Sequence, residues 1–251
     1  MSGAHDTVMG NTMLRNDRLG ALLLGVFIFL GLSSLGYLLG TSAIRVKQYE
    51  RSVTVKGLSE REYPADVVIW PIQFTAAGND LQALYAVTED NTARVRTFLV
   101  EHGVAEGEIT ASAPAVTDKS AQQYGNNARP EFRYTAQQAV TVYSENIDAV
   151  RSIMGALSEL GKQGIAFTGG DYQSQTDYLF TRLNAVKPEM IEEATDNARQ
   201  VAQKFAADSH STLGKIKSAS QGRFSIEPRD KNNPHIKKVR VVSTVEYYLS
   251  D

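Results

Sequence analysis

Few residues in this chain could carry chemistry, and they are scattered along it. The four histidines are His5, His102, His210 and His235. No two of them have the spacing of a metal-ligand pair, and those in the predicted domain fall at helix ends or in loops. Ser209 and Ser211 flank His210, but a hydrolase nucleophile needs a strained turn and an acidic partner, and the sequence places neither beside these serines. We therefore expect no catalytic, metal-binding or cofactor-binding residues.

Composition excludes further classes of protein. The chain has no cysteine, which rules out disulfides, thiol catalysis, iron–sulfur clusters and cysteine-based zinc sites. Its net charge is −2, and its best basic cluster, Lys237, Lys238 and Arg240, lies in a strand pattern whose alternation separates Lys237 from the other two. Because phosphate binding needs a concentrated basic face, we expect no nucleic-acid partner. A small-molecule ligand cannot be named from the sequence.

Tyrosine is the one residue type whose placement suggests a binding surface. Tyr134, Tyr172 and Tyr178 lie on predicted strands, and Tyr124 is the only apolar anchor in the polar loop 117–131. These four residues form a candidate interaction surface for a ligand or a second subunit. Aromatic residues are also good strand formers, and this structural interpretation is the favoured one.

One hydrophobic segment dominates the N-terminal part of the chain. Residues 19–44 carry no charge and lie between Arg18 and Arg45, and their apolar stretch is long enough to cross a bilayer as one helix. We expect an uncleaved transmembrane signal-anchor. The alternatives are a signal peptide cleaved near residues 41–43 and a buried helix of a soluble protein. Basic residues stand on both sides of the segment, and long domains translocate largely regardless of charge, so these charges do not determine its orientation.

Hydrophobic periodicity predicts an α+β domain after the apolar segment. The order of elements is β-β-α-β-β-α-β-α-β-β, which fits an antiparallel sheet with two to three packed helices. Strands are predicted at 51–58, 65–76, 109–116, 132–143, 165–180, 213–226 and 236–249. Helices are predicted between Asp80 and Gly103, at 145–160 and from the 184–188 region to 208. The strand–helix–strand pattern of 65–116 recurs weakly at 165–220, as an internal β-α-β repeat.

Two prolines and one helix face give sharper expectations. Pro71 lacks a ladder donor, so it is predicted at a sheet edge or a bulge. Pro188 is predicted in the first turn of the third helix, where its missing N–H needs no partner. The buried stripe of that helix is predicted to consist of Met190, Ile191, Ala194, Ala198, Val201 and Phe205.

Three stretches of the chain resemble the SIMPL-domain (DUF541) family. They are the helical run EEATDNAR at 192–199 with LGKI at 213–216, the strand FRYTA at 132–136 with VTV at 140–142, and the closing strand VRVVSTVEYY at 239–248. The resemblance covers about residues 52–249. Two departures are Glu131, where the family usually has glycine, and DSHST at 208–212, before the LGK triplet.

The resemblance implies a bacterial cell-envelope protein of the membrane-anchored subgroup, without established catalytic residues. It implies the inner (cytoplasmic) membrane as location, with the domain in the periplasm. The chain would then consist of a short cytoplasmic tail at 1–18, a transmembrane signal-anchor helix at 19–44, a connector at 45–51 and a SIMPL-like periplasmic domain at 52–251. Some members of the family are associated with oligomers and with stress phenotypes.

Three functional hypotheses follow from these observations. The first is a non-enzymatic, membrane-tethered envelope protein that contacts the bilayer through residues 19–44 and forms homo-oligomers, with a link to envelope or oxidative stress. The alternative is a ligand- or partner-binding module that uses the 117–131 loop and the strand tyrosines. The third is an unrecognised hydrolase or redox enzyme, which requires His102, His210 and an acidic side chain to meet in one pocket.

Overall fold

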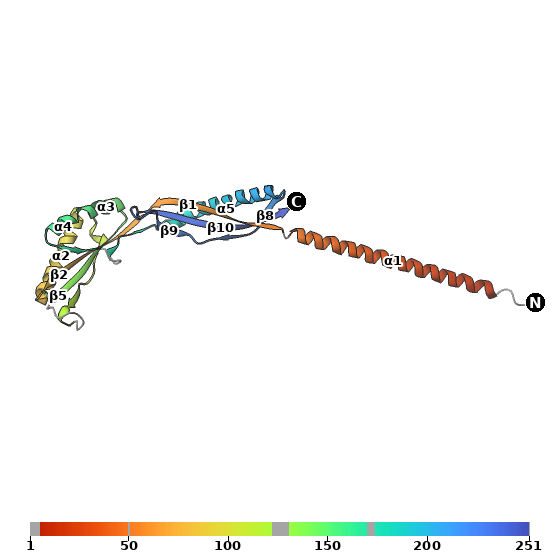
Figure 1. The fold of residues 1–251 in the computed structure, drawn as a ribbon, viewed down its shortest axis with the longest axis horizontal. Helices are drawn as coiled ribbons and strands as arrows, with labels where there is room; N and C mark the ends of the chain where they lie inside the picture. Colours follow the sequence, from red (N-terminus) through yellow and green to blue (C-terminus); the bar gives the residue numbers. More distant parts are fainter. Residues whose placement is uncertain (1–5, 50, 122–130, 170–173, 251) are drawn as a thin grey trace, which may run out of the picture. The chain divides into compact units, whose positions relative to one another are not determined.

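The computed structural model describes residues 6–49, 51–121, 131–169 and 174–250. Its helices are α1 (Asp6–Tyr49), α2 (Leu81–Glu101), α3 (Ile147–Ala156), α4 (Ser158–Lys162) and α5 (Leu183–Asp208), with short 3-10 helices at Glu106–Glu108 and Lys119–Ala121. Its strands are β1 (Ser52–Pro64), β2 (Val67–Gly78), β3 (Ile109–Ala111), β4 (Ala115–Asp118), β5 (Tyr134–Ser144), β6 (Ala166–Thr168), β7 (Asp177–Leu179), β8 (Thr212–Gln221), β9 (Ser225–Pro228) and β10 (Ile236–Ser250). Figure 1 shows this order along the chain, and the predicted α+β class with antiparallel strands is confirmed.

The chain divides into two compact units. Unit 1 contains residues 1–56, 198–220 and 244–251, and unit 2 contains residues 57–197 and 221–243. The long elements β1, β8, α5 and β10 contribute residues to both units.

Helix α1 contains the apolar segment that the sequence singles out. Its stretch Gly20–Ser42 is 23 residues long and apolar enough to cross a membrane, and none of the segment is buried by the rest of the chain. Large side chains such as Phe27 and Phe29 are more than two-thirds exposed. This helix fits a single-pass membrane anchor, and an N-terminal signal sequence would meet the same criteria of length and composition.

Unit 2 contains a six-stranded sheet in the order β3-β5-β2-β6, with β4 also pairing with β5 and β7 with β2. Strands β2 and β5 pair from Val68 opposite Ser144 to Gly78 opposite Tyr134. As the alternation predicts, one face of β2 is buried, at Val68, Trp70, Ile72 and Phe74. Helix α2 packs against this core through Val95, Phe98 and Leu99.

Both ends of α2 have the residues that the sequence indicates as its start and stop signals. The Asp80 side chain caps the first turn by accepting the Ala83 N–H at 2.7 Å. After the helix, Gly103 has φ 93°, a left-handed conformation that glycine adopts without strain. The helix therefore lies between Asp80 and Gly103, as predicted.

The second sheet has the order β1-β10-β8, and β9 also pairs with β10. Alternate residues of β10 are buried, from Lys237 through Val245 to Tyr247. In unit 1 they pack with Val55, Ala198 and Ala202, and in unit 2 Val239 and Val241 pack with Met190 and Ala194. Strand β8 is an end strand, and nine of its ten residues are exposed.

The buried face of α5 agrees with the predicted stripe at Met190, Ala194 and Ala198 and differs from it in the second half of the helix. Its fully or nearly fully buried residues recur every fourth position, at Met190, Ala194, Ala198, Ala202 and Ala206. Val201 and Phe205, which were predicted to be buried, are 41% and 56% exposed. Residues four apart share one helix face, so burial of this face leaves Val201 and Phe205, each one position before a buried alanine, on a neighbouring exposed face.

The two proline predictions have different outcomes. Pro188 lies inside α5, which begins at Leu183, so its predicted place in the first turn is wrong. The start is set earlier because the Asp66 carboxylate accepts the Thr181 and Arg182 N–H groups at 2.8 and 3.2 Å.

Pro71 lies within β2, but on one edge of that strand β7 pairs only with Val67–Ile69 and β6 only with Gln73–Thr75. Pro71 thus occupies the interval between two partner strands, a local edge within the sheet.

Four predicted elements are split, and one of them is the strand at 213–226, which is divided into β8 and β9. The strand at 109–116 is divided into β3 and β4, separated by Pro114, which cannot donate to the ladder. The strand at 165–180 is divided into β6 and β7, and Gly170 and Tyr172 lie outside the described residues. The helix at 145–160 is divided at Leu157, whose N–H points to the Met154 carbonyl in a tighter turn.

We predict that Ala202→Leu destabilises the domain. Ala202 is fully buried in the interface between α5 and the sheet, and overpacking such a site typically costs about 1–3 kcal/mol. Thermal unfolding of the detergent-solubilised chain measures the effect, with Ala207→Leu on the exposed side of the same helix as control. Equal unfolding midpoints for the two variants would show that the alanine stripe does not control the packing.

Candidate functional site

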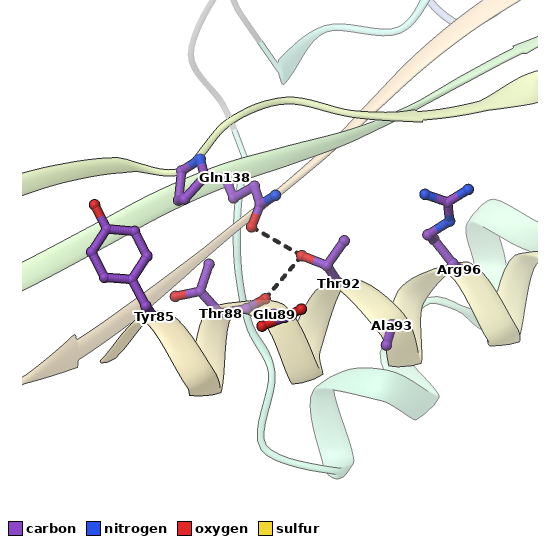
Figure 2. A pocket seen from close by; sticks show the side chains of 8 residues that line it. Tyr85, Thr88, Glu89, Thr92, Ala93, Arg96 and Gln138 are labelled. Carbon is purple, nitrogen blue, oxygen red and sulfur yellow. Dashed lines mark hydrogen bonds between the residues drawn. The ribbon is translucent and has the colours of Figure 1, made fainter. Parts of the chain in front are cut away.

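A groove lies beside α2 in unit 2. It encloses about 380 Å³ and is lined by Tyr85, Thr88, Glu89, Thr92, Ala93, Arg96, Pro114 and Gln138. The first six lie on α2, whereas Pro114 precedes β4 and Gln138 lies on β5. Figure 2 shows Gln138 reaching toward Thr92, with Tyr85 and Arg96 on opposite sides of that pair.

A hydrogen-bond network forms the polar part of the groove. Thr92 Oγ1 lies 2.9 Å from Gln138 Oε1 and 2.8 Å from the Thr88 carbonyl, so its one hydroxyl proton is shared between two acceptors. The Gln138 amide donates to the Ser112 carbonyl at 2.7 Å. Because Gln138 is only 8% exposed, these bonds satisfy a side chain that water does not reach.

The rest of the lining is amphipathic. Tyr85 is 47% exposed and offers an aromatic face together with a hydroxyl, and Ala93 and Pro114 add apolar surface. Arg96 forms an ion pair with Glu106 at the groove's edge. Thr88 and Thr92 donate to backbone carbonyls one turn back, and neither is hydrogen-bonded to a histidine or a carboxylate. The groove therefore combines an amphipathic lining with two threonine hydroxyls that already donate to backbone carbonyls.

A second hollow surrounds His235, also in unit 2. It encloses about 210 Å³ and is lined by Pro64, Ala65, Glu145, Asn146, Ile147, Asp148 and His235. The His235 carbonyl accepts the Ala65 N–H at 2.8 Å. The imidazole ring of His235 and the ring of Tyr178 are in edge contact, with their centroids 6.0 Å apart. Burial lowers the pKa of His235, and the positive charges of Arg151 and Arg229 lower it further, against the opposing effect of Asp148 and Asp230.

The four tyrosines of the candidate interaction surface have different positions. Tyr178 is 8% exposed and packs in the unit 2 core, so it is a core residue rather than part of an open surface, and burial raises its pKa. Tyr134 is half-buried at the start of β5, with the Arg133 guanidinium 4.8 Å from its ring centroid. Tyr124 and Tyr172 lie outside the described residues. The interaction surface as a whole stays a prediction.

The other domain histidines have local structural partners. His102 follows α2, where its Nδ1 lies 2.7 Å from the Phe98 carbonyl and its ring packs on the Phe98 ring. His210 follows α5 and has φ 53°. Neither lines the groove or the His235 hollow. Within the described ranges, His, Asp and Glu form no group of three that could hold a metal ion.

Two features of unit 2, the α2 groove and the burial of Lys237, were not predicted from the sequence. The groove was missed because Thr92 and Gln138 are 46 positions apart and belong to different elements. Its one local signal was Thr88, a polar residue at a buried position of α2. Lys237 does lie on the opposite strand face from Lys238 and Arg240, as predicted, but it is 8% exposed rather than solvated. Burial lowers its pKa, with Asp177 acting in the opposite direction.

We predict that His235 makes the stability of the domain depend on pH. Its pKa in the folded chain lies below the usual 6.5, so between the two values the unfolded chain binds more protons. The contribution of His235 to stability is therefore complete above pH 6.5 and decreases as the pH falls through the folded-state pKa. Thermal unfolding between about pH 7.5 and 5 measures this slope. His235→Gln should flatten it, and an unchanged slope in this variant would contradict the assignment.

We predict that Thr92→Val weakens the packing of α2 on β5. The substitution leaves the buried Gln138 Oε1 without its donor, and an unsatisfied buried acceptor costs about 1–3 kcal/mol. Chemical denaturation measures the loss. Thr97→Val makes the same chemical change at an exposed position of the same helix and should have little effect. A loss of equal size in both variants would show that helix propensity, not the Gln138 bond, is responsible.

Comparison with known proteins agrees with the architecture. The family model described as SIMPL, protein of unknown function (DUF541), matches residues 53–246. The matched range begins in β1, ends in β10 and contains both the groove and the His235 hollow. The comparison with curated proteins gives no match. Since the match covers most of the chain, this protein belongs to the SIMPL (DUF541) family.

Proposed function

We propose that this chain is a non-enzymatic, membrane-tethered protein of the cell envelope that self-associates through its folded domain. The membrane tether is supported by the apolar stretch Gly20–Ser42, none of which is buried by the rest of the chain. Each exposed apolar side chain of this kind loses roughly 1.5–3 kcal/mol by remaining in water instead of an apolar medium. A bilayer supplies the cover that the rest of the chain does not provide.

The side of the membrane and the stress link rest on the family. Its bacterial members resemble exported envelope proteins, which favours the inner membrane as the site of the anchor and the periplasm as the location of the domain. The arginines and lysines that flank the span do not oppose this orientation, because long domains translocate largely regardless of local charge. The link to envelope or oxidative stress is proposed from the same resemblance.

The non-enzymatic part of the proposal is supported by the chemistry of the two hollows. In the groove, both threonine hydroxyls donate to backbone carbonyls. In the other hollow, His235 has Asn146 and Asp148 among its neighbours, but the Asn146 side chain accepts the Ala149 N–H as the cap of α3. These hydroxyl and amide groups are thus engaged in structural hydrogen bonds, which supports a non-enzymatic role.

Self-association is supported by strand β8. It is an end strand of its sheet, ten residues long, and nine of those residues are exposed. A long end strand presents unpaired backbone groups that another chain can bind. Ile216, in the middle of β8, is 42% exposed, and Tyr248 on the neighbouring strand β10 is 38% exposed. These two side chains give the edge an apolar component.

We predict that the full chain in detergent is an oligomer and that Ile216→Glu shifts it toward the monomer, because a carboxylate at this edge must be desolvated on pairing. Light scattering coupled to size exclusion measures the mass. Val87→Glu, at a half-exposed position of α2 in unit 2, is the matched control and should keep the mass of the original chain. A monomeric chain at high concentration would contradict self-association and would favour a binding module whose site is the α2 groove.

A further inference from the structure

Charge is divided unequally between the two units. The folded part of unit 1, residues 51–56, 198–220 and 244–250, has six basic and two acidic side chains, a net charge of +4. The basic ones are Arg51, Lys56, Arg199, Lys204, Lys215 and Lys217, and the acidic ones are Asp208 and Glu246. Unit 2 has 16 basic and 22 acidic residues, a net charge of −6. A chain with an overall charge of only −2 therefore contains one distinctly basic unit.

The basic unit is the one joined to the apolar span. Nine residues lead from Ser42, the last residue of the span, to Arg51. Even fully extended, they place Arg51 within about 32 Å of the end of the span. The Arg51 carbonyl accepts the Leu249 N–H at 2.9 Å, and its guanidinium contacts Ser211 Oγ at 3.4 Å. The chain therefore holds this end of unit 1 near any membrane that the span crosses.

An exposed apolar pair lies close to the same end. Val201 and Phe205 are one helical turn apart on α5 and are 41% and 56% exposed. Lys204, exposed as well, is a helix-surface neighbour of Val201 and precedes Phe205. The turn after Phe205 leads directly to the Arg51 contact, since the Ser211 N–H donates to the Ala206 carbonyl at 2.8 Å.

We propose that this end of unit 1 docks on the surface of an anionic bilayer. Phe205 and Val201 enter the headgroup region, and Lys204, which lies beside them on α5, contacts lipid phosphates. A basic helix surface with an exposed aromatic side chain has the composition of an interfacial membrane contact. This inference rests on the proposed membrane tether and adds a second, reversible contact to it.

Lipid fits this surface better than a second protein copy does. Two partly exposed side chains provide far less area than the roughly 1,200–2,000 Å² that a stable protein interface buries. A bilayer contact needs no such area here, because a tether of nine residues keeps the surface at high local concentration next to the membrane. The excess of basic over acidic side chains complements anionic phospholipid directly.

The absence of cysteine allows a direct test on the full chain. Val201→Cys, labelled with a small environment-sensitive fluorophore, is reconstituted into vesicles of phosphatidylcholine and phosphatidylglycerol that contain lipids brominated near the headgroup. We expect roughly twofold quenching of the label, since interfacial side chains reach about 5–10 Å into the headgroup and acyl boundary. The same label at Val87→Cys, half-exposed in the acidic unit, is the matched control and should not be quenched.

Second substitutions identify the contacts. Phe205→Ser and Lys204→Glu, each combined with the Val201 label, should reduce the quenching, and vesicles of phosphatidylcholine alone should do the same. Both positions are exposed on α5, so these changes leave the core intact. Equal quenching in all of these samples would overturn the proposal, because it would show that the label meets lipid without the Phe205 and Lys204 contacts.

Three further outcomes are distinguishable. If the chain resists alkaline extraction from the vesicles but the Val201 label is not quenched, the tether stands and the docking is overturned. If alkali releases the chain, the tether itself fails, and the docking that rests on it fails too. If the label becomes protected from an aqueous quencher only at high protein-to-lipid ratio, without quenching by brominated lipid, a second copy covers Val201 and the lipid contact is overturned.

Discussion

The pairing of β2 with β5 is the interaction on which the six-stranded sheet of unit 2 depends. It extends over almost the full length of both strands, and its buried side contains Trp70, Phe74 and Val142. Strands β3 and β4 have β5 as their partner, and β6 and β7 have β2. Helix α2 packs on the same core, and the α2 groove exists because Gln138 of β5 reaches Thr92 across it. Loss of this pairing would remove the sheet, the helix contact and the groove together.

A different constraint governs the sheet formed by β1, β10 and β8. Helix α5 contacts it through alanines at four-residue spacing, which brings backbone close to backbone but buries little apolar area per residue. Larger side chains are consequently left outside the interface, among them Val201 and Phe205 on the helix and Ile216 on β8. The alanine stripe of α5 thus accounts for the exposure of Val201 and Phe205. The proposed bilayer contact uses these two side chains, and the proposed self-association uses Ile216.

Local periodicity explains which parts of the structure could be predicted from the sequence. The positions of β2 and β10 and the two ends of α2 depend on patterns among neighbouring residues, and they were predicted correctly to within a few residues. The face of α5 was predicted correctly at Met190, Ala194 and Ala198. It was predicted wrongly at Val201 and Phe205, because both rank above alanine in hydrophobicity, whereas the buried positions nearby are Ala202 and Ala206. The groove could not be predicted, since no local pattern connects Thr92 with Gln138. The start of α5 was likewise decided by a distant residue, Asp66.

Pro71 has a consequence for how the sheet of unit 2 opens. On one edge of β2, the ladder is divided into two three-residue segments, held by β7 before the proline and by β6 after it. Each segment is short, and neither shares a hydrogen bond with the other through Pro71, which has no N–H. Amide protons of β6 and β7 can therefore exchange with solvent in separate local openings while the β2–β5 ladder stays closed. Pro71 thus divides one edge of the sheet into two short segments that can open separately.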